Sequence, residues 1–233
     1  MTPGVRLLER QEGGRPWPVL VWDGGPGWRA LSTALLGGGL RACAWWLDAQ
    51  VDKEYFHPDP VAHAREIAAG LGLDPDAGAA MLTAADVRRG TTATDEGVLA
   101  AATVGLGLPV WAAVPADAAA RETAEPVGTI NVLVVVPVPL ADAALVNAVV
   151  TATEAKAQAL AEAGVRGTGT SSDAVCVVCP EPGEGQDAEP YGGPRSTWGA
   201  RVARAVHAAV AAGTADWLAG GSGMSDAGGR IGT

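Results

Sequence analysis

The chain has 233 residues, of which 48% are hydrophobic and 18% charged, a composition typical of a folded globular protein rather than a disordered one. Its formal net charge of −10 argues against nucleic-acid binding, which requires basic surface to neutralise phosphates. No apolar run approaches the roughly 18 residues of a membrane-spanning helix, and the N-terminus lacks the pattern of a secretion signal, so we expect a cytoplasmic protein without a membrane partner.

The first third of the chain has the pattern of short strands followed by a helix. Residues 17–56 alternate apolar runs such as "PVLVW" with turn clusters such as "DGGPG", which predicts strands and turns. In "HPDPVAHAREIAAGLGL", Asp59 is a typical helix N-cap and Pro60 suits the first helical position, so we expect a helix there. We interpret His57 and His63 as solvated or capping side chains rather than ligands.

The middle of the chain predicts a hairpin and a long loop. "AAMLTAADV" and "GVLAAATVGLG" are typical of strands, and the polar "RRGTTATDE" between them is typical of a hairpin connection. Residues 113–127 are the most loop-like interior stretch of the sequence.

Residues 129–179 carry the clearest architectural signal. An apolar strand at 129–136, a helix at 140–163 and a second apolar strand at 173–179 follow in order, which predicts a β-α-β unit. We therefore expect an α/β (α+β) fold, with a layered mixed sheet and flanking helices, in a single domain spanning residues 1–213.

The helix at 140–163 carries a lysine at an unexpected position. Five apolar residues gather on one side of the helical wheel: Val146, Val149, Val150, Ala157 and Leu160. Thr153 and Lys156 fall on or near that side, and Glu154 lies at its margin. Because an unpaired buried ammonium is costly, Lys156 is expected either to reach water along its stem or to be a charge positioned beside a pocket.

The strand at 173–179 follows a loop rich in hydroxyl groups. "GTGTSSDAV" contains Thr168, Thr170, Ser171, Ser172 and Asp173. Such loops can bind anions or orient a substrate amide, and many are ordinary turns. In the strand, Cys176 and Cys179 form a C-x-x-C, but residues three apart on a strand point to opposite faces, so we expect no metal site.

The C-terminal part predicts a loop, a helix and a tail. Residues 180–190 are rich in Pro, Gly and Glu, and a helix is expected over 198–213, with apolar residues spaced by four along one side. His207 falls away from that side and is expected to be exposed. Residues 214–233 are expected to form a mobile tail.

Short motifs such as G-x-x-x-x-G-K-[ST], G-x-S-x-G and H-E-x-x-H are absent, but longer stretches carry a resemblance. "GTINVLVVV", "TATEAKAQAL", "GTGTSSDAV" and "YGGPRSTWGARVARAV", in that order, resemble the adenosylcobinamide amidohydrolase (CbiZ) family. "LSTALLGGG", "MLTAADV" and "ATVGLGLPVWA" fit the same family upstream, so the resemblance covers roughly residues 20–212.

This resemblance implies a cobalamin-salvage hydrolase that cuts a linear amide C–N bond in a small-molecule corrinoid. The implied substrate is adenosylcobinamide, and the products are adenosylcobyric acid and 1-amino-2-propanol. Cobalt arrives within the substrate, so no protein-bound cofactor or metal is implied. Family members often carry a histidine in the segment where this chain has Tyr191, Pro194 and Arg195. Since arginine cannot act as a general base near neutral pH, Arg195 cannot replace such a base.

A second resemblance concerns the mechanism. The order glycine, hydroxyl residue, apolar strand, long helix and polar loop ending in Asp is similar to that of β-peptidyl aminopeptidases and ornithine acetyltransferases. Those enzymes cut themselves before a Ser or Thr nucleophile in a layered αββα fold, which implies Thr129, after Gly128, as the nucleophile here. Amide hydrolysis also needs a base and oxyanion donors. The other catalytic candidates are Glu154, Lys156 and Asp173, and the substrate-binding candidates are Asn131, Thr153, Thr168, Thr170, Ser171, Ser172, Tyr191 and Arg195.

Two other functions stay open at this point: a non-catalytic corrinoid-binding module and a self-processing, threonine peptidase-like amidase. A homo-oligomer is compatible with all of them. Four tryptophans either offer a flat apolar surface to a macrocycle or pack in the core: Trp22, Trp28, Trp45 and Trp46.

Overall fold

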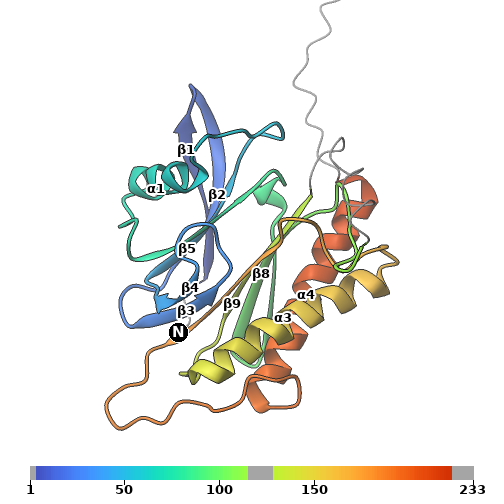
Figure 1. The fold of residues 1–233 in the computed structure, drawn as a ribbon. Coiled ribbons are helices and arrows are strands. Elements are labelled where there is room, and N and C mark those ends of the chain that lie inside the picture. The colour runs from blue at the N-terminus through green and yellow to red at the C-terminus, as the bar shows by residue number, and fades with distance from the viewer. Residues whose placement is uncertain (1–3, 115–127, 222–233) are drawn as a thin grey trace, which may run out of the picture.

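Two β-sheets packed face to face form the centre of the computed structural model, which describes residues 4–114 and 128–221 (Figure 1). One sheet has the order β1-β2-β5-β6, with β1 (Val5–Glu12), β2 (Arg15–Asp23), β5 (Trp45–Gln50) and β6 (Gly78–Thr83). The other has the order β4-β3-β10-β9-β8-β7, with β4 (Gly39–Ala42), β3 (Trp28–Ser32), β10 (Ala174–Pro180), β9 (Thr129–Val135), β8 (Val98–Gly105) and β7 (Thr91–Asp95). Both sheets are mixed, because β5 pairs with β6, and β9 with β10, in parallel.

Helices cover the outer face of each sheet. α1 (Pro60–Gly70) packs on the four-stranded sheet, whereas α3 (Asp142–Glu162) and α4 (Thr197–Asp216) pack on the six-stranded sheet. Two short turns, η1 (Val87–Arg89) and η2 (Trp217–Gly221), accompany them. The four layers, αββα, confirm the expected layered mixed sheets with flanking helices.

β9 is buried on both faces, and its side chains divide between two interiors. Leu133 and Val135 lie between the sheets, whereas Val132 and Val134 face α3 and α4. Because side chains alternate along a strand, Thr129 and Asn131 also point toward the space between the sheets. Burial on both faces explains the nearly continuous apolar run of this strand.

The predicted β-α-β unit is present. β9, α3 and β10 follow in order, and the two strands are parallel, with Asn131 opposite Ala174. The predicted start of α1 is also correct, because the Asp59 carboxylate accepts a hydrogen bond from the Ala62 N–H at 2.9 Å.

The predicted hairpin is wrong in its pairing. The polar stretch "RRGTTATDE" contains a strand of its own, β7, which pairs with β8, while β6 belongs to the other sheet. β7 is an edge strand, so its sequence lacks the apolar residues that mark an interior strand. Most of the predicted loop at 113–127 lies outside the described residues.

The C-terminal helix is longer than predicted. α4 runs to Asp216, and Thr214, placed by the prediction in the tail, is fully buried. Arg89 pairs with Asp216 at 2.6 Å at the end of the helix. His207 is only partly exposed and contacts Glu162 at 2.8 Å. Residues 222–233 lie outside the described part of the chain.

The buried face of α3 consists mainly of alanines, so the prediction was right for Leu160 and wrong for Val146 and Val150. Ala144, Ala148 and Ala152 are fully buried, whereas Val146 and Val150 are 54% and 48% exposed. Small side chains let α3 approach its neighbours closely: a Cβ atom at Gly192, in the segment before α4, would clash with the Ala144 carbonyl oxygen. Close packing, rather than side-chain hydrophobicity, therefore decides which face is buried.

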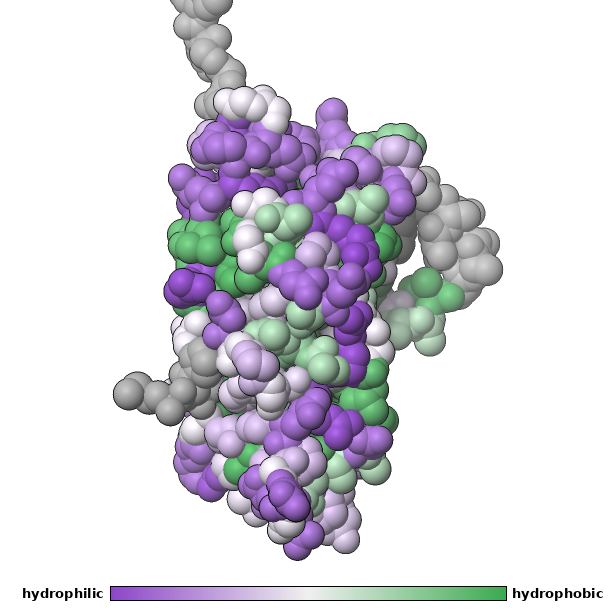
Figure 2. Space-filling view, turned by 90° about the vertical axis from the view of Figure 1, so that its left-hand side faces the viewer, coloured by the Kyte–Doolittle hydropathy of each residue, from purple (hydrophilic) through white to green (hydrophobic). Residues whose placement is uncertain are grey.

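The N-terminal tryptophans belong to the core. Trp22, Trp45 and Trp46 are buried, and Trp28 packs edge-on against Trp22 with 5.1 Å between ring centroids. Trp22, Trp45 and Trp46 therefore offer no open surface to a macrocycle, and Trp28 is only partly exposed. On the side of the molecule formed by the four-stranded sheet and α1, hydrophilic and hydrophobic residues are interspersed (Figure 2). None of the described helices is long and apolar enough to cross a bilayer.

Candidate active site

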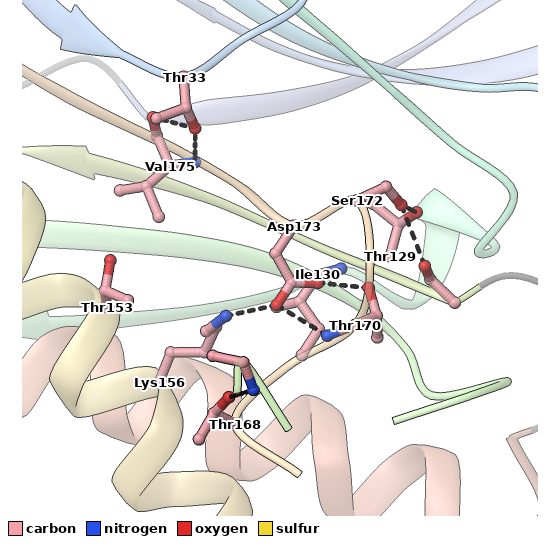
Figure 3. A network of polar contacts seen from close by, with 12 residues as sticks. Thr33, Thr129, Ile130, Thr153, Lys156, Thr168, Thr170, Ser172, Asp173 and Val175 are labelled. Carbon is pink, nitrogen blue, oxygen red and sulfur yellow. Dashed lines mark hydrogen bonds and ion pairs between the residues drawn. The ribbon is translucent and has the colours of Figure 1, made fainter. Parts of the chain in front are cut away.

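Polar side chains gather where β9 and β10 begin. Because the two strands are parallel, their amino ends meet at one edge of the sheet, with Thr129 at the start of β9 and Asp173 directly before β10. Lys156 reaches this edge from the buried face of α3. These side chains and their partners in the 167–173 loop form what we call the Thr129 cluster: Thr129, Lys156, Thr170, Ser172 and Asp173 (Figure 3).

Asp173 holds the cluster together. One carboxylate oxygen accepts hydrogen bonds from the Ile130 N–H at 2.9 Å and the Thr170 hydroxyl at 2.5 Å. The other accepts from the Thr170 N–H at 3.1 Å and from the Lys156 ammonium (Figure 3). Four donors occupy both oxygens, so this carboxylate is suited to fixing the loop against β9 and α3 rather than to taking a proton.

A pair of hydroxyl groups lies beside this ion pair. The Thr129 and Ser172 hydroxyl oxygens are 2.7 Å apart, and the Ser172 hydroxyl donates to the Gly128 carbonyl oxygen at 3.1 Å. Since a serine hydroxyl has a single hydrogen, Thr129 must be the donor in its bond to Ser172. The Thr129 oxygen thereby keeps its lone pairs free for chemistry, at a site with Ser171 and Ser172 on its exposed side.

Glycines allow the loop to pass this close. A Cβ atom at Gly169 would clash with the Asp173 carboxylate, and one at Gly128 would clash with the Gly105 carbonyl oxygen. Thr168 supports the loop with both its backbone and its side chain: its N–H donates to the Val110 carbonyl at 2.9 Å, and its hydroxyl accepts from the Ala112 N–H at 3.2 Å. Thr168 is thus used to hold the loop in place.

Other predicted site residues lie apart from the cluster. Thr153 and Glu154 are exposed on α3, and the Thr153 hydroxyl donates to the Val149 carbonyl of its own helix (Figure 3). Tyr191 and Arg195 lie in the segment between the carboxyl end of β10 and α4, whereas Asp173 precedes the amino end of β10. They line a separate cavity of about 400 Å³. The structure therefore divides the predicted residues between the two ends of the sheet.

One residue at this site was missed from the sequence. Asp48 of β5 is fully buried between the sheets and accepts hydrogen bonds from the Asn131 amide at 2.8 Å and the Thr103 hydroxyl at 2.6 Å. Burial raises the pKa of Asp48 to about 6, although the two hydrogen bonds act in the opposite direction. The sequence feature that could have revealed Asp48 is its position as a lone carboxylate inside the apolar stretch "WWLDAQ".

The contacts of Asn131 limit its role. Its NH₂ group donates to Asp48 at 2.8 Å and to the Leu82 carbonyl at 3.3 Å. Both hydrogens are thus engaged, and the side chain is not poised to donate to an oxyanion.

A second group of ionisable side chains surrounds His63 of α1. His63 is buried, not solvated as expected: its ring nitrogens lie 2.9 Å from the Tyr55 hydroxyl and 3.1 Å from the Glu12 carboxylate. His57 accepts a hydrogen bond from the Asp59 N–H, in keeping with a capping role. Glu12 and Tyr55 line a cavity of about 460 Å³ that contains no residue of the Thr129 cluster.

The cysteines face different interiors. Cys176 lies between the sheets and Cys179 on the helix side, as their spacing predicted. Within residues 4–114 and 128–221, no group of three His, Cys, Asp or Glu side chains is close enough to hold a metal ion.

Comparison with known proteins yields a consistent set of relatives. A family model described as adenosylcobinamide amidohydrolase matches residues 5–221. A protein of Methanosarcina mazei named adenosylcobinamide amidohydrolase is 31% identical over 190 residues, which cover 79% of this chain and 88% of the relative. A Halobacterium salinarum protein of the same name is 35% identical over 191 residues, or 80% of either chain. The range matched by the family model contains Asp48 and the whole Thr129 cluster.

Proposed function

The chain belongs to the adenosylcobinamide amidohydrolase family, and we propose that it hydrolyses the amide joining the corrin propionate to aminopropanol in adenosylcobinamide. The products are adenosylcobyric acid and 1-amino-2-propanol, and cobalt enters and leaves within the corrinoid. The observation that carries the proposal is the family match, which spans both sheets, the helices on either side and the Thr129 cluster.

We propose Thr129 as the nucleophile. Its hydroxyl oxygen attacks the amide carbonyl carbon and forms an ester with the corrinoid acyl group, while the hydroxyl proton passes to the departing amine. Water then cleaves the ester, which releases adenosylcobyric acid and restores the threonine. The contact with Ser172 supports this role because it holds the Thr129 hydroxyl in one orientation while its oxygen keeps its lone pairs free to attack.

In this mechanism, the ion pair of Lys156 with Asp173 holds the 167–173 loop, and with it Ser172, in place beside Thr129. Asp173 ties the 167–173 loop to β9, and Lys156 ties the same carboxylate to α3. The Thr129 hydroxyl on β9 and the Ser172 hydroxyl in the loop are thereby held with little freedom relative to each other, which lowers the entropic part of the barrier.

Incubation of the purified protein with adenosylcobinamide, followed by mass spectrometry, tests the proposal. We expect adenosylcobyric acid and free aminopropanol in equal amounts. Tight binding without product would instead identify a corrinoid-binding module. An intact mass below that of the full 23.4 kDa chain, matching a cut before Thr129, would show that the threonine acts as an N-terminal nucleophile.

A further inference from the structure

Trp111 is a large apolar side chain that the fold leaves exposed. All eight tryptophans of the chain lie within the described residues, and Trp111 is the most exposed of them, at 52%. It belongs to the stretch "GLGLPVWAAV", residues 105–114, which contains no charged residue although the chain has a net charge of −10. Contiguous apolar surface of this kind is typical of a binding site when it adjoins polar groups that can do chemistry.

The segment that carries Trp111 begins opposite the proposed nucleophile. Gly105, the last residue of β8, pairs with Thr129 in the antiparallel register of β8 and β9. Gly107 stays close to the same place, because a Cβ atom at Gly128 would lie 2.8 Å from the Gly107 nitrogen. The chain thus leaves β8 directly against the start of β9.

Further along, the segment is fixed to the 167–173 loop of the Thr129 cluster. Val110 donates its N–H to the Gly169 carbonyl at 2.8 Å and accepts a hydrogen bond from the Thr168 N–H at 2.9 Å. The Ala112 N–H donates to the Thr168 hydroxyl at 3.2 Å. Trp111 lies between these two anchored residues, so its backbone has little freedom and its side chain extends from a fixed point beside the loop.

A tryptophan held in this way can bind an apolar ligand at a low entropic cost. Its backbone is already fixed, and an indole ring has only two side-chain torsions to immobilise. Gly167 permits the close approach that fixes it, because a Cβ atom there would lie 2.8 Å from the Val110 carbonyl oxygen. The exposed part of the Trp111 ring is therefore available to a ligand that reaches the Thr129 cluster.

The proposed substrate would bring a large apolar surface to this place. The amide that is cut lies at the end of a short propionate chain on the edge of the corrin ring. A substrate whose amide carbon reaches Thr129 therefore holds its corrin ring only a few bonds away. The adenosyl group, in contrast, is bound to cobalt at the centre of the ring and lies further from the amide.

We propose that Trp111 is a substrate-binding residue whose indole ring packs against the corrin ring of adenosylcobinamide while the amide lies at Thr129. This inference rests on the proposed function. The corrin ring takes no part in bond breaking, so the contact is the same in the ground state and in the transition state. It therefore contributes to binding and not to the chemical step.

Steady-state kinetics of three variants test this role. Trp111→Ala should raise KM for adenosylcobinamide at least about tenfold and leave kcat within about twofold, because it removes binding that both states share. Trp111→Phe keeps an aromatic ring, so its KM should stay within about threefold of the wild-type value. Phe56→Ala is the matched control: it removes an aromatic side chain that is 91% exposed between β5 and α1, and both constants should be unchanged.

Oxidative footprinting of the wild type locates the contact without any substitution. Hydroxyl radicals oxidise exposed indole rings, and mass spectrometry of peptides reports the oxidation of each tryptophan. Adenosylcobinamide should lower the oxidation rate of Trp111 relative to that of Trp17, which is partly exposed on β2 of the other sheet. Dicyanocobinamide, which lacks the adenosyl group, should protect Trp111 to the same extent, because the corrin ring makes the contact.

The failures of the two proposals are distinguishable. A wild type that neither binds nor hydrolyses adenosylcobinamide overturns the proposed function and this role with it. A wild type that forms no product while the corrinoid protects Trp111 overturns the hydrolysis and supports the contact.

Three results in an active enzyme would overturn the role of Trp111 alone. They are an unchanged KM in Trp111→Ala, a fall in kcat without a rise in KM, and no protection of Trp111 beyond that of Trp17. Protection by adenosylcobinamide but not by dicyanocobinamide would contradict the contact with the corrin ring and assign it to the adenosyl group.

Discussion

Lys156 shows how a single contact decides between two interpretations of a sequence. On a helix face that packs in the core, a lysine either extends to water or finds a buried partner. Asp173 is that partner, and the two side chains are only 7% and 11% exposed. The ion pair joins α3 to the loop before β10, so the charge of Lys156 is part of the architecture of the site.

Replacement of Lys156 by Met should therefore destabilise the protein. Asp173 would keep its three other hydrogen bonds but lose its cation, at a cost of about 3 kcal/mol in the free energy of unfolding. Urea denaturation followed by circular dichroism measures the change. Lys53→Met, in an exposed loop, should cost less than about 0.5 kcal/mol. Equal stability of the two variants would show that the ion pair contributes nothing.

Thr129 is expected to tolerate only a hydroxyl side chain. If Thr129 is the nucleophile as proposed, Thr129→Ala should lower kcat by at least about a thousandfold, because it removes the attacking oxygen, whereas Thr129→Ser should retain measurable turnover. Steady-state kinetics with adenosylcobinamide checks both. Thr94→Ala, on the exposed side of β7, should behave as the wild type. A fully active Thr129→Ala variant would exclude the nucleophile and favour direct attack by water.

Sequence reasoning reached the Thr129 cluster because its residues belong to one β-α-β unit, whose parallel strands must begin at one edge. It could not reach Asp48, whose partners Thr103 and Asn131 are 55 and 83 residues away in the chain. No local sequence pattern indicates which strand of one sheet packs against which strand of the other.

α3 shows that packing distance, and not hydrophobicity alone, selects the buried face of a helix. Ala148 and Ala152 face the core, and Val146 and Val150 face outward. A hydrophobic side chain of larger volume on the alanine face would have to displace α4 or the sheet, since both lie against it.

Enlarging one of these alanines should be costly. Ala152→Leu should lower the free energy of unfolding by about 1–3 kcal/mol through overpacking, whereas Val150→Leu, on the outer face, should change it by less than about 0.5 kcal/mol. Differential scanning calorimetry of the two variants makes the comparison. The reverse order would mean that the valine face is the buried one in solution.

The elements that follow from local signals were predicted correctly, and those that follow from pairing were not. The cap at Asp59 and the β9-α3-β10 unit each depend on a few neighbouring residues. β7, in contrast, is a strand because it pairs with the edge of β8, and its own sequence does not indicate this pairing. The end of α4 likewise depends on the distant Arg89.

At the scale of the whole molecule, the two sheets meet through an apolar layer interrupted by Asp48. The sheet assignment of the N-terminal strands is not visible in the sequence, since β3 and β4 join the second sheet by pairing β3 with the distant β10. The layered class was predictable from the order of elements, but this division between the sheets was not.

Asp48, buried between the two sheets, should make the free energy of unfolding depend on pH. The pKa of Asp48 rises from an ordinary 3.8 to about 6 on folding, so between these values the folded state binds more protons than the unfolded state. Stability from this group is thus greatest at low pH and falls as pH rises toward 6, by about 3 kcal/mol in all. Urea denaturation of the wild type and Asp48→Asn should give free energies that diverge over this range, with the variant the more stable above it. A constant difference would contradict a raised pKa.

The most direct test of the central claim is hydrolysis of adenosylcobinamide in water labelled with heavy oxygen. Amide cleavage by this protein predicts that the label enters the new carboxyl group of adenosylcobyric acid and that the released 1-amino-2-propanol carries none. Recovery of intact adenosylcobinamide, or label in the amino alcohol, would contradict it.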